Sequence, residues 1–134
     1  MALSIEFTTS RRYASADGIE IPVELSVGNQ RVELLARLDT GAANCIFERR
    51  YAEALGLEVE SGRAQRFRSM AGSFMAYEHE LPIHTLGIEL SALVFFAHDR
   101  VFNRNFLGRA GWLDRLRVGI IDYDRLIYLS AYNG

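Results

Sequence analysis

The stretch LDTGAANCIF, at residues 38–47, places one carboxylate, that of Asp39, inside an otherwise apolar run. Thr40, Gly41 and Ala42 follow it, so the carboxylate lies at a turn where backbone N–H groups are free to bond it. An acid held firmly between two strands that are predicted to be buried is a candidate for general acid–base chemistry, because an unpaired charge is costly in such a place. The simpler alternative is an Asx-type turn that carries no chemistry.

Other side chains that could do chemistry lack the surroundings that it needs. Cys45 could form a catalytic thiol–imidazole pair with His79, His84 or His98. However, the sequence places neither a helix N-terminus nor flanking glycines where they would activate the thiol. We therefore expect Cys45 to be a small buried apolar residue. The histidines lack a metal-ligand spacing such as H-E-x-x-H, and no Gly-rich loop opens onto a lysine-bearing helix. We expect no metal site and no cofactor.

The elements that must position Asp39 are mainly strands. Residues 19–27 alternate in period two, the turn residues GNQ follow, and residues 32–38 resume the apolar pattern, which predicts a β-hairpin that ends at Asp39. Further along the chain the patterns predict a long hairpin at 66–82 around AGS, a strand pair or one long bent strand at 87–96, a brief helix at 112–117, and two strands at 118–130.

One short helix is predicted at residues 48–56. Tyr51, Ala54 and Leu55 share one helical face, and Gly56 stands where a helix would stop. The working architecture is therefore a mainly β domain with one or two short helices.

Length and composition bound the class of the protein. Its 134 residues suffice for one domain, residues 1–134, that removes roughly two thirds of its unfolded surface from water. Hydrophobic residues make up 49% of the chain and charged residues 24%, which argues against disorder. A net charge of −2 does not indicate a basic surface that would bind nucleic acid or an anionic membrane. A single cysteine and an N-terminus without a long apolar segment predict a cytoplasmic protein.

Three features, in order, resemble the retropepsin-like aspartic proteases, the single-domain relatives of retroviral proteases. They are Asp39-Thr40-Gly41-Ala42 after a strand, a hairpin about Ala71-Gly72-Ser73 that is similar to a flap, and Phe106-Leu107-Gly108 followed by Arg109. The resemblance spans about residues 19–130. It implies an all-β fold, a retropepsin-like acid-protease barrel with one or two short helices that assembles as a two-fold homodimer.

A single Asp-Thr-Gly triplet decides the assembly that this resemblance implies. Pepsin-like chains carry two such loops, whereas the retroviral type places one loop from each of two identical subunits across a two-fold axis. The resemblance therefore implies an aspartic endopeptidase in which two Asp39 carboxylates, one from each subunit, activate a water against a peptide bond. Thr40 would hydrogen-bond across the axis, and Gly41 would let a backbone approach the carboxylate.

The resemblance also implies roles away from the Asp39 loop. A flap would close over an extended peptide or protein substrate and exclude water from it. The residues expected at this flap are Met70, Ala71, Gly72, Ser73 and Phe74. Those expected to support the site structurally are Leu107, Gly108 and Arg109, and Ala42 is expected to support it as part of the Asp39 loop.

A few positions depart from the retroviral pattern. Ala43 stands where that pattern has an acid that binds the substrate backbone, so Arg109 needs a different partner. The flap tip has one glycine, Gly72, where viral flaps have more. A catalytically silent dimer that binds an extended peptide by strand addition on the same fold is the alternative.

Overall fold

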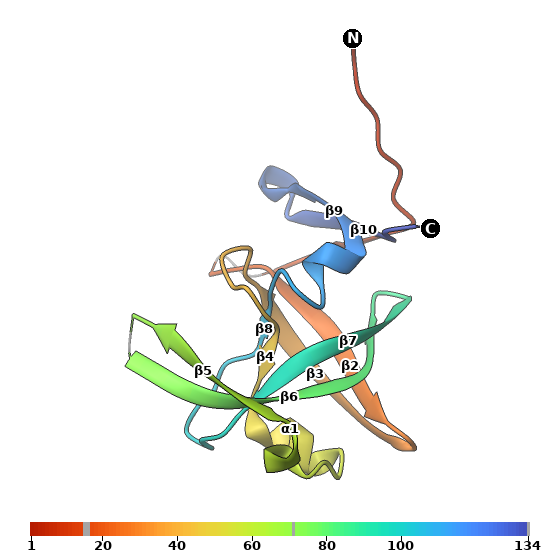
Figure 1. The fold of residues 1–134 in the computed structure, drawn as a ribbon. Coiled ribbons are helices and arrows are strands. Elements are labelled where there is room, and N and C mark those ends of the chain that lie inside the picture. The colour runs from red at the N-terminus through yellow and green to blue at the C-terminus, as the bar shows by residue number, and fades with distance from the viewer. Residues whose placement is uncertain (15–16, 71, 134) are drawn as a thin grey trace.

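The computed structural model describes residues 1–14, 17–70 and 72–133, and most of these residues lie in β-strands (Figure 1). The strands are β1 (Thr9–Arg12), β2 (Glu20–Val27), β3 (Gln30–Leu38), β4 (Ile46–Phe47), β5 (Arg63–Ser69), β6 (Gly72–Thr85), β7 (Ile88–Ala97), β8 (Phe106–Leu107), β9 (Leu116–Ile121) and β10 (Leu126–Ala131). The described residues also form one α-helix, α1 (Arg49–Ala54), and the 3-10 turns η1 (Val59–Ser61), η2 (Leu113–Arg115) and η3 (Asp122–Asp124). The prediction of a mainly β domain is confirmed.

The larger sheet in this described part of the chain has seven strands, in the order β2-β3-β8-β4-β7-β6-β5. A further antiparallel pairing of β2 with β6, at Glu24↔His84 and Leu25↔Ile83, closes the sheet into a barrel. The predicted hairpin at 66–82 is β5 with β6, and β5 lies outside the ring that the β2–β6 pairing closes. The run at 87–96 is one long strand, β7.

The hairpin of β2 and β3 forms as its alternation predicts. Ile21, Val23 and Leu25 are buried, while the residues between them are partly exposed. Each buried aliphatic side chain of this kind stabilises the fold by about 1.5–3 kcal/mol relative to exposure. Gly28 has φ of +58°, the left-handed conformation that the tight turn requires. The hairpin thus places the end of β3, directly before Asp39, in the wall of the barrel.

The predicted helix is present as α1, at the end of the barrel opposite β9 and β10 (Figure 1). It ends as expected, because Leu55 caps it and Gly56 has φ of +77°. The face predicted from Tyr51, Ala54 and Leu55 is only partly buried, because Leu55 is buried and Tyr51 half-buried whereas Ala54 is exposed. Residues three apart share a helix face, and the inner face here includes Ala52. In the described residues no helix has the length and apolar character to span a membrane.

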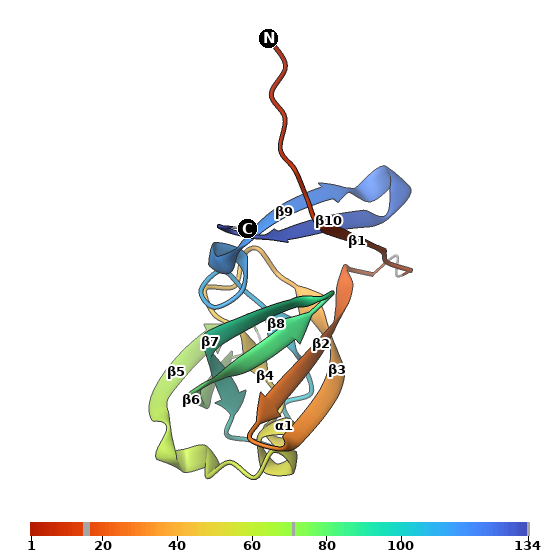
Figure 2. The same ribbon diagram turned by 90° about the vertical axis from the view of Figure 1, so that its right-hand side faces the viewer.

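A second sheet, of three antiparallel strands in the order β1-β10-β9, lies against one end of the barrel (Figure 2). The two predicted strands at its C-terminal side are confirmed as β9 and β10. The helix predicted at 112–117 is wrong, because only η2 forms and Leu116 already begins β9. Gly111 has φ of +98°, and the fully buried Trp112 has φ of −136° and ψ of −68°, so neither residue has helical backbone angles and a continuous helix cannot start there.

Candidate active site

Asp39 is positioned by the long strand β3 and the two-residue strand β8, which run parallel. Leu38, the last residue of β3, pairs with Leu107 of β8. The ladder continues one step further, because the backbone N–H of Asp39 donates a hydrogen bond to the Leu107 carbonyl at 2.9 Å. Leu107 is fully buried. The backbone of Asp39 is thus anchored to the core, while its side chain is half-buried at the surface of the barrel.

The carboxylate of Asp39 is held by the turn that follows it. The backbone N–H of Gly41 donates to Asp39 Oδ1 at 2.9 Å, and the N–H of Ala42 donates to the Asp39 carbonyl at 3.1 Å. A Cβ at Gly41 would lie 3.3 Å from Oδ1, so a side chain there would crowd the carboxylate. The Asx-type turn that the sequence left open therefore exists, and it orients the acid.

Thr40 lies at the exposed point of this turn. Its hydroxyl has no hydrogen-bond partner among the residues that the structure describes. The expected bond of Thr40 across a two-fold axis stays a prediction.

The loop after β8 interlocks with the Asp39 loop. Arg109 N–H donates to the Ala42 carbonyl at 2.9 Å, and Ala110 N–H donates to the Ala43 carbonyl at 2.8 Å. Gly108 makes this approach possible, since it is buried against the backbone of the facing loop. The predicted supporting segment therefore does contact the Asp39 loop, and it does so through its backbone.

The side chain of Arg109 takes no part in this contact. It is exposed and makes no hydrogen bond or ion pair with the described residues. Ala43, the residue at the position of the expected acid, is exposed, and its backbone carbonyl accepts the Ala110 N–H, but its side chain offers no charge. No alternative partner for Arg109 is found within the described chain.

Cys45 lies directly behind the two loops. It is fully buried, and its Sγ accepts a long hydrogen bond from the Gly108 N–H at 3.4 Å. Burial raises the pKa of the thiol to about 12. Cys45 is therefore a buried neutral thiol, in line with the sequence interpretation.

The flap-like hairpin is formed by β5 and the start of β6, which remain paired up to Gly72. Met70 at its tip is fully exposed, and the hydroxyl of Ser73 accepts a hydrogen bond from Arg66 at 3.3 Å. Ala71, which was also predicted here, lies outside the described residues. The contact of this hairpin with a substrate stays a prediction.

Phe74 of the hairpin belongs to an aromatic cluster. Its ring stacks on Phe67, with centroids 5.5 Å apart, and lies 4.7 Å from the ring of Phe102. Phe102 in turn lies 6.4 Å from Phe106 of β8. A hollow of about 310 Å³ lies between the tip of the hairpin and this cluster, and Phe74, Phe102 and Phe106 border it. The hairpin is thus linked by aromatic contacts to the strand that anchors Asp39.

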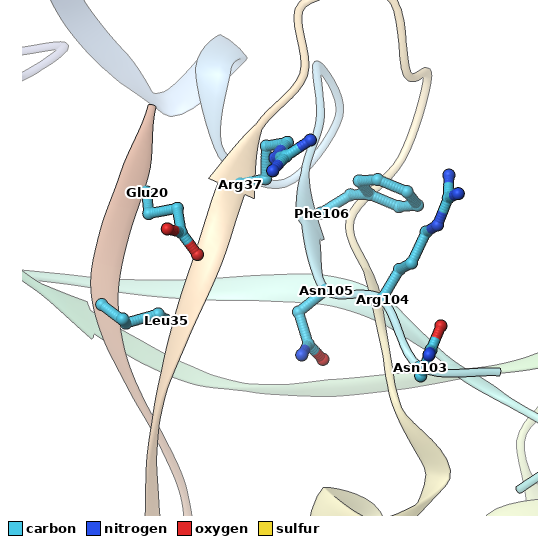
Figure 3. A pocket seen from close by; sticks show the side chains of 7 residues that line it. All are labelled: Glu20, Leu35, Arg37, Asn103, Arg104, Asn105 and Phe106. Carbon is cyan, nitrogen blue, oxygen red and sulfur yellow. The ribbon is translucent and has the colours of Figure 1, made fainter. Parts of the chain in front are cut away.

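A second hollow, of about 300 Å³, lies along the outer side of β3 and β8 (Figure 3). It is lined by Glu20, Leu35, Arg37, Asn103, Arg104, Asn105 and Phe106. Sequence reasoning named Phe106 for its motif and missed the other residues. The signal that was available is the spacing of Arg37 and Asp39, since residues two apart on a strand share a face.

Comparisons with known proteins bear on the fold. No family model matches the sequence, and no curated protein matches it. The structure is similar to a retropepsin-like aspartic protease from Rickettsia conorii, with a TM-score of 0.65 and 17% identity, covering 90% of this chain and 98% of that chain. It is also similar to EIAV protease complexed with the inhibitor HBY-793, with a TM-score of 0.56 and 18% identity, covering 72% of this chain and 86% of that chain. The chain therefore has the retropepsin-like fold, as its sequence resemblance implied.

Proposed function

We propose that the protein is a homodimeric aspartic endopeptidase whose active site combines Asp39 from each of two subunits. The observation that carries the proposal is the fixed Asp39 carboxylate, which accepts the Gly41 N–H at 2.9 Å at the end of a strand anchored to buried Leu107. The solved structures that the chain resembles are proteases, and the chain has one Asp-Thr-Gly triplet. One triplet supplies one carboxylate, so a site with two acids requires a second copy.

Two carboxylates in one site behave as a pair. At a separation of about 4 Å and an effective dielectric near 20 they repel by about 4 kcal/mol, so they share one proton over a wide pH range. The ionised Asp39 draws a proton from a water held between the two acids. The protonated Asp39 of the other copy donates to the carbonyl oxygen of the substrate, and the water oxygen attacks the carbonyl carbon. The C–N bond then breaks as the Asp39 that took the proton from water donates it to the leaving amine nitrogen, and the Asp39 of the other copy recovers its proton from the hydroxyl of the intermediate. No covalent enzyme intermediate is needed.

The neighbouring backbone has a defined part in this mechanism. The Gly41 N–H bond keeps one carboxylate oxygen oriented, which leaves the other oxygen available for the shared proton and the water. The backbone bonds of Arg109 and Ala110 to the Asp39 loop fix that loop in position. Preorganised groups of this kind lower the barrier because they need no rearrangement during reaction.

The test is peptide cleavage by the intact protein. A diverse peptide pool is incubated with wild-type protein, with Asp39→Asn, and with Asp124→Asn, which changes an exposed acid on η3 that is far from the site in sequence. We expect wild type and Asp124→Asn to cut the same bonds and Asp39→Asn to cut none, while all three share one oligomeric state by sedimentation. Equal cleavage by Asp39→Asn removes Asp39 from the mechanism. Peptide binding without cleavage in every variant supports the silent peptide-binding module instead.

A further inference from the structure

Arg37 and Asp39 lie on the same face of the chain. Leu34 and Ala36 of β3 are buried, whereas Leu35 and Arg37 are exposed, so the odd-numbered residues of this strand face outward. The hydrogen bond from Asp39 to β8 continues the same ladder, which extends this alternation to Asp39. Two residues along a strand span about 7 Å.

An extended peptide repeats with the same period. When a peptide lies along this face with one residue beside Asp39, the peptide residue two positions away points in the same direction and therefore lies next to Arg37. The hollow beside β3 and β8 is located at this point, because Arg37 pairs directly with Phe106 of β8 and both residues line the hollow.

Arg104 reaches the same hollow from the segment before β8. Figure 3 shows its side chain directed along the side of the Phe106 ring, and Arg104 and Phe106 line both this hollow and the one below the flap-like hairpin. Arg37 and Arg104 thus both line a concave surface, and Arg37 lies two residues before Asp39 in the chain.

Neither guanidinium is neutralised within the described chain. Arg37 lies over Gly18, and neither it nor Arg104 makes a side-chain hydrogen bond or an ion pair with a described residue. Glu20 also lines the hollow, opposite Arg37 on β2, but forms no ion pair with it. The lining therefore carries one net positive charge, and its two arginines keep their donors free for a ligand carboxylate.

We infer that this protein prefers peptide substrates with an acidic side chain close to the cleaved bond, and that Arg37 and Arg104 recognise that side chain in the hollow beside β3 and β8. This inference rests on the proposed function, because it places the substrate along the Asp39 strand. The recognition is electrostatic and directional, since a guanidinium donates two parallel N–H bonds to a carboxylate. It weakens at high salt, because both arginines are exposed.

The first experiment compares matched peptides. A peptide that the wild-type protein cleaves is resynthesised with Glu, and separately with its neutral isostere Gln, at each position near the cleaved bond. We expect kcat/KM to favour Glu by about fivefold or more at one position. Arg37→Gln and Arg104→Gln should each reduce this ratio, and the double variant should bring it to about one. Arg31→Gln, an exposed arginine at the far end of the same strand, should leave the ratio unchanged.

The second experiment does not depend on cleavage. Asp39→Asn protein is titrated onto an array of short peptides in paired Glu and Gln versions, and binding is compared with that of Asp39→Asn combined with Arg37→Gln and Arg104→Gln. Preferential binding of Glu peptides that the added variants abolish supports the inference even when the wild type cleaves nothing, in which case only the proposed function fails. Equal binding and equal turnover of Glu and Gln peptides, or a preference that survives loss of both arginines, overturns the inference.

Discussion

Gly108 and Asn44 lie so close that a Cβ on Gly108 would come within 2.2 Å of the Asn44 carbonyl oxygen. The same Cβ would lie 2.8 Å from the carbonyl of Ala42. Both contacts are with backbone, which cannot rotate away as a flexible side chain can. The glycine is therefore what lets the segment after β8 lie against the loop that carries Asp39.

We predict that Gly108→Ala destabilises the protein by about 1–3 kcal/mol or more, because the two loops must separate to admit the methyl group. The midpoint of urea unfolding measures this change. Gly28→Ala is the control, since its Cβ meets nothing within 4 Å and its cost arises from its φ of +58° alone, about 1–2 kcal/mol. We also expect Gly108→Ala to lose peptide cleavage even under conditions where it is fully folded, whereas Gly28→Ala keeps it. Full activity in Gly108→Ala would show that the loop contact is dispensable.

Mixed dimers test whether one active site uses two chains. If wild-type subunits exchange with Asp39→Asn subunits, each heterodimer has one carboxylate and lacks either the acid or the base. Activity should then follow the square of the wild-type fraction at fixed total protein, so that an equal mixture keeps about a quarter of it. Rates measured across a series of mixing ratios give the exponent. A linear decrease would mean that each chain carries a complete site.

The ion pair between Arg49 and Glu60 predicts a pH dependence of stability. Arg49 donates to Glu60 at 2.7 Å, and this bond lowers the pKa of the Glu60 carboxyl below its ordinary value. A lowered pKa in the folded state contributes stability above the unfolded value, about 4.3, and that contribution is lost as the pH falls through the folded value. We therefore expect Glu60→Gln to have a lower Tm than wild type at pH 7, and the difference in Tm to shrink progressively as the pH falls below about 4. Glu89→Gln, on the exposed side of β7, is the control and should show no such convergence.

Cys45 predicts the chemistry of the only thiol in the sequence. Because burial raises its pKa to about 12 and excludes reagent, the native protein should react very slowly with a thiol-specific disulfide reagent at pH 8. The reaction should accelerate to the rate of an unfolded peptide when urea unfolds the chain, and the colour released by the reagent reports both rates. Rapid labelling of the folded protein would contradict the buried position behind the Asp39 loop.

The sequence predicts the elements whose signals are local. The β2–β3 hairpin follows from alternation and a glycine turn, and Asp39 follows from a triplet after a strand. β1 is missed because Thr9–Arg12 has no apolar alternation, and its strand conformation comes from pairing with β10. The helix predicted at 112–117 is absent because burial of Trp112 and the left-handed Gly111 override local propensity.

The residues of the candidate site likewise include some that a local sequence pattern reveals and others that it does not. The acid and its turn are contiguous, so the sequence shows them together. The hollow with Arg37 and Arg104 is not contiguous, because the parallel register of Arg37 with Phe106 brings together segments that are far apart in the chain. A contact of that kind depends on strand pairing, which no local pattern encodes.

The order of strands in the small sheet has a consequence for how the chain folds. β10 is the central strand of that sheet, and it pairs β1 from near the start of the chain with β9 (Figure 2). Until residues 126–131 leave the ribosome, β1 has no partner in this sheet, while every strand of the barrel has already been synthesised. Contacts this distant in sequence form slowly because they close a long loop. We therefore expect the barrel to be organised first and the N-terminal strand to be the last part of the chain to be protected from hydrogen exchange during refolding.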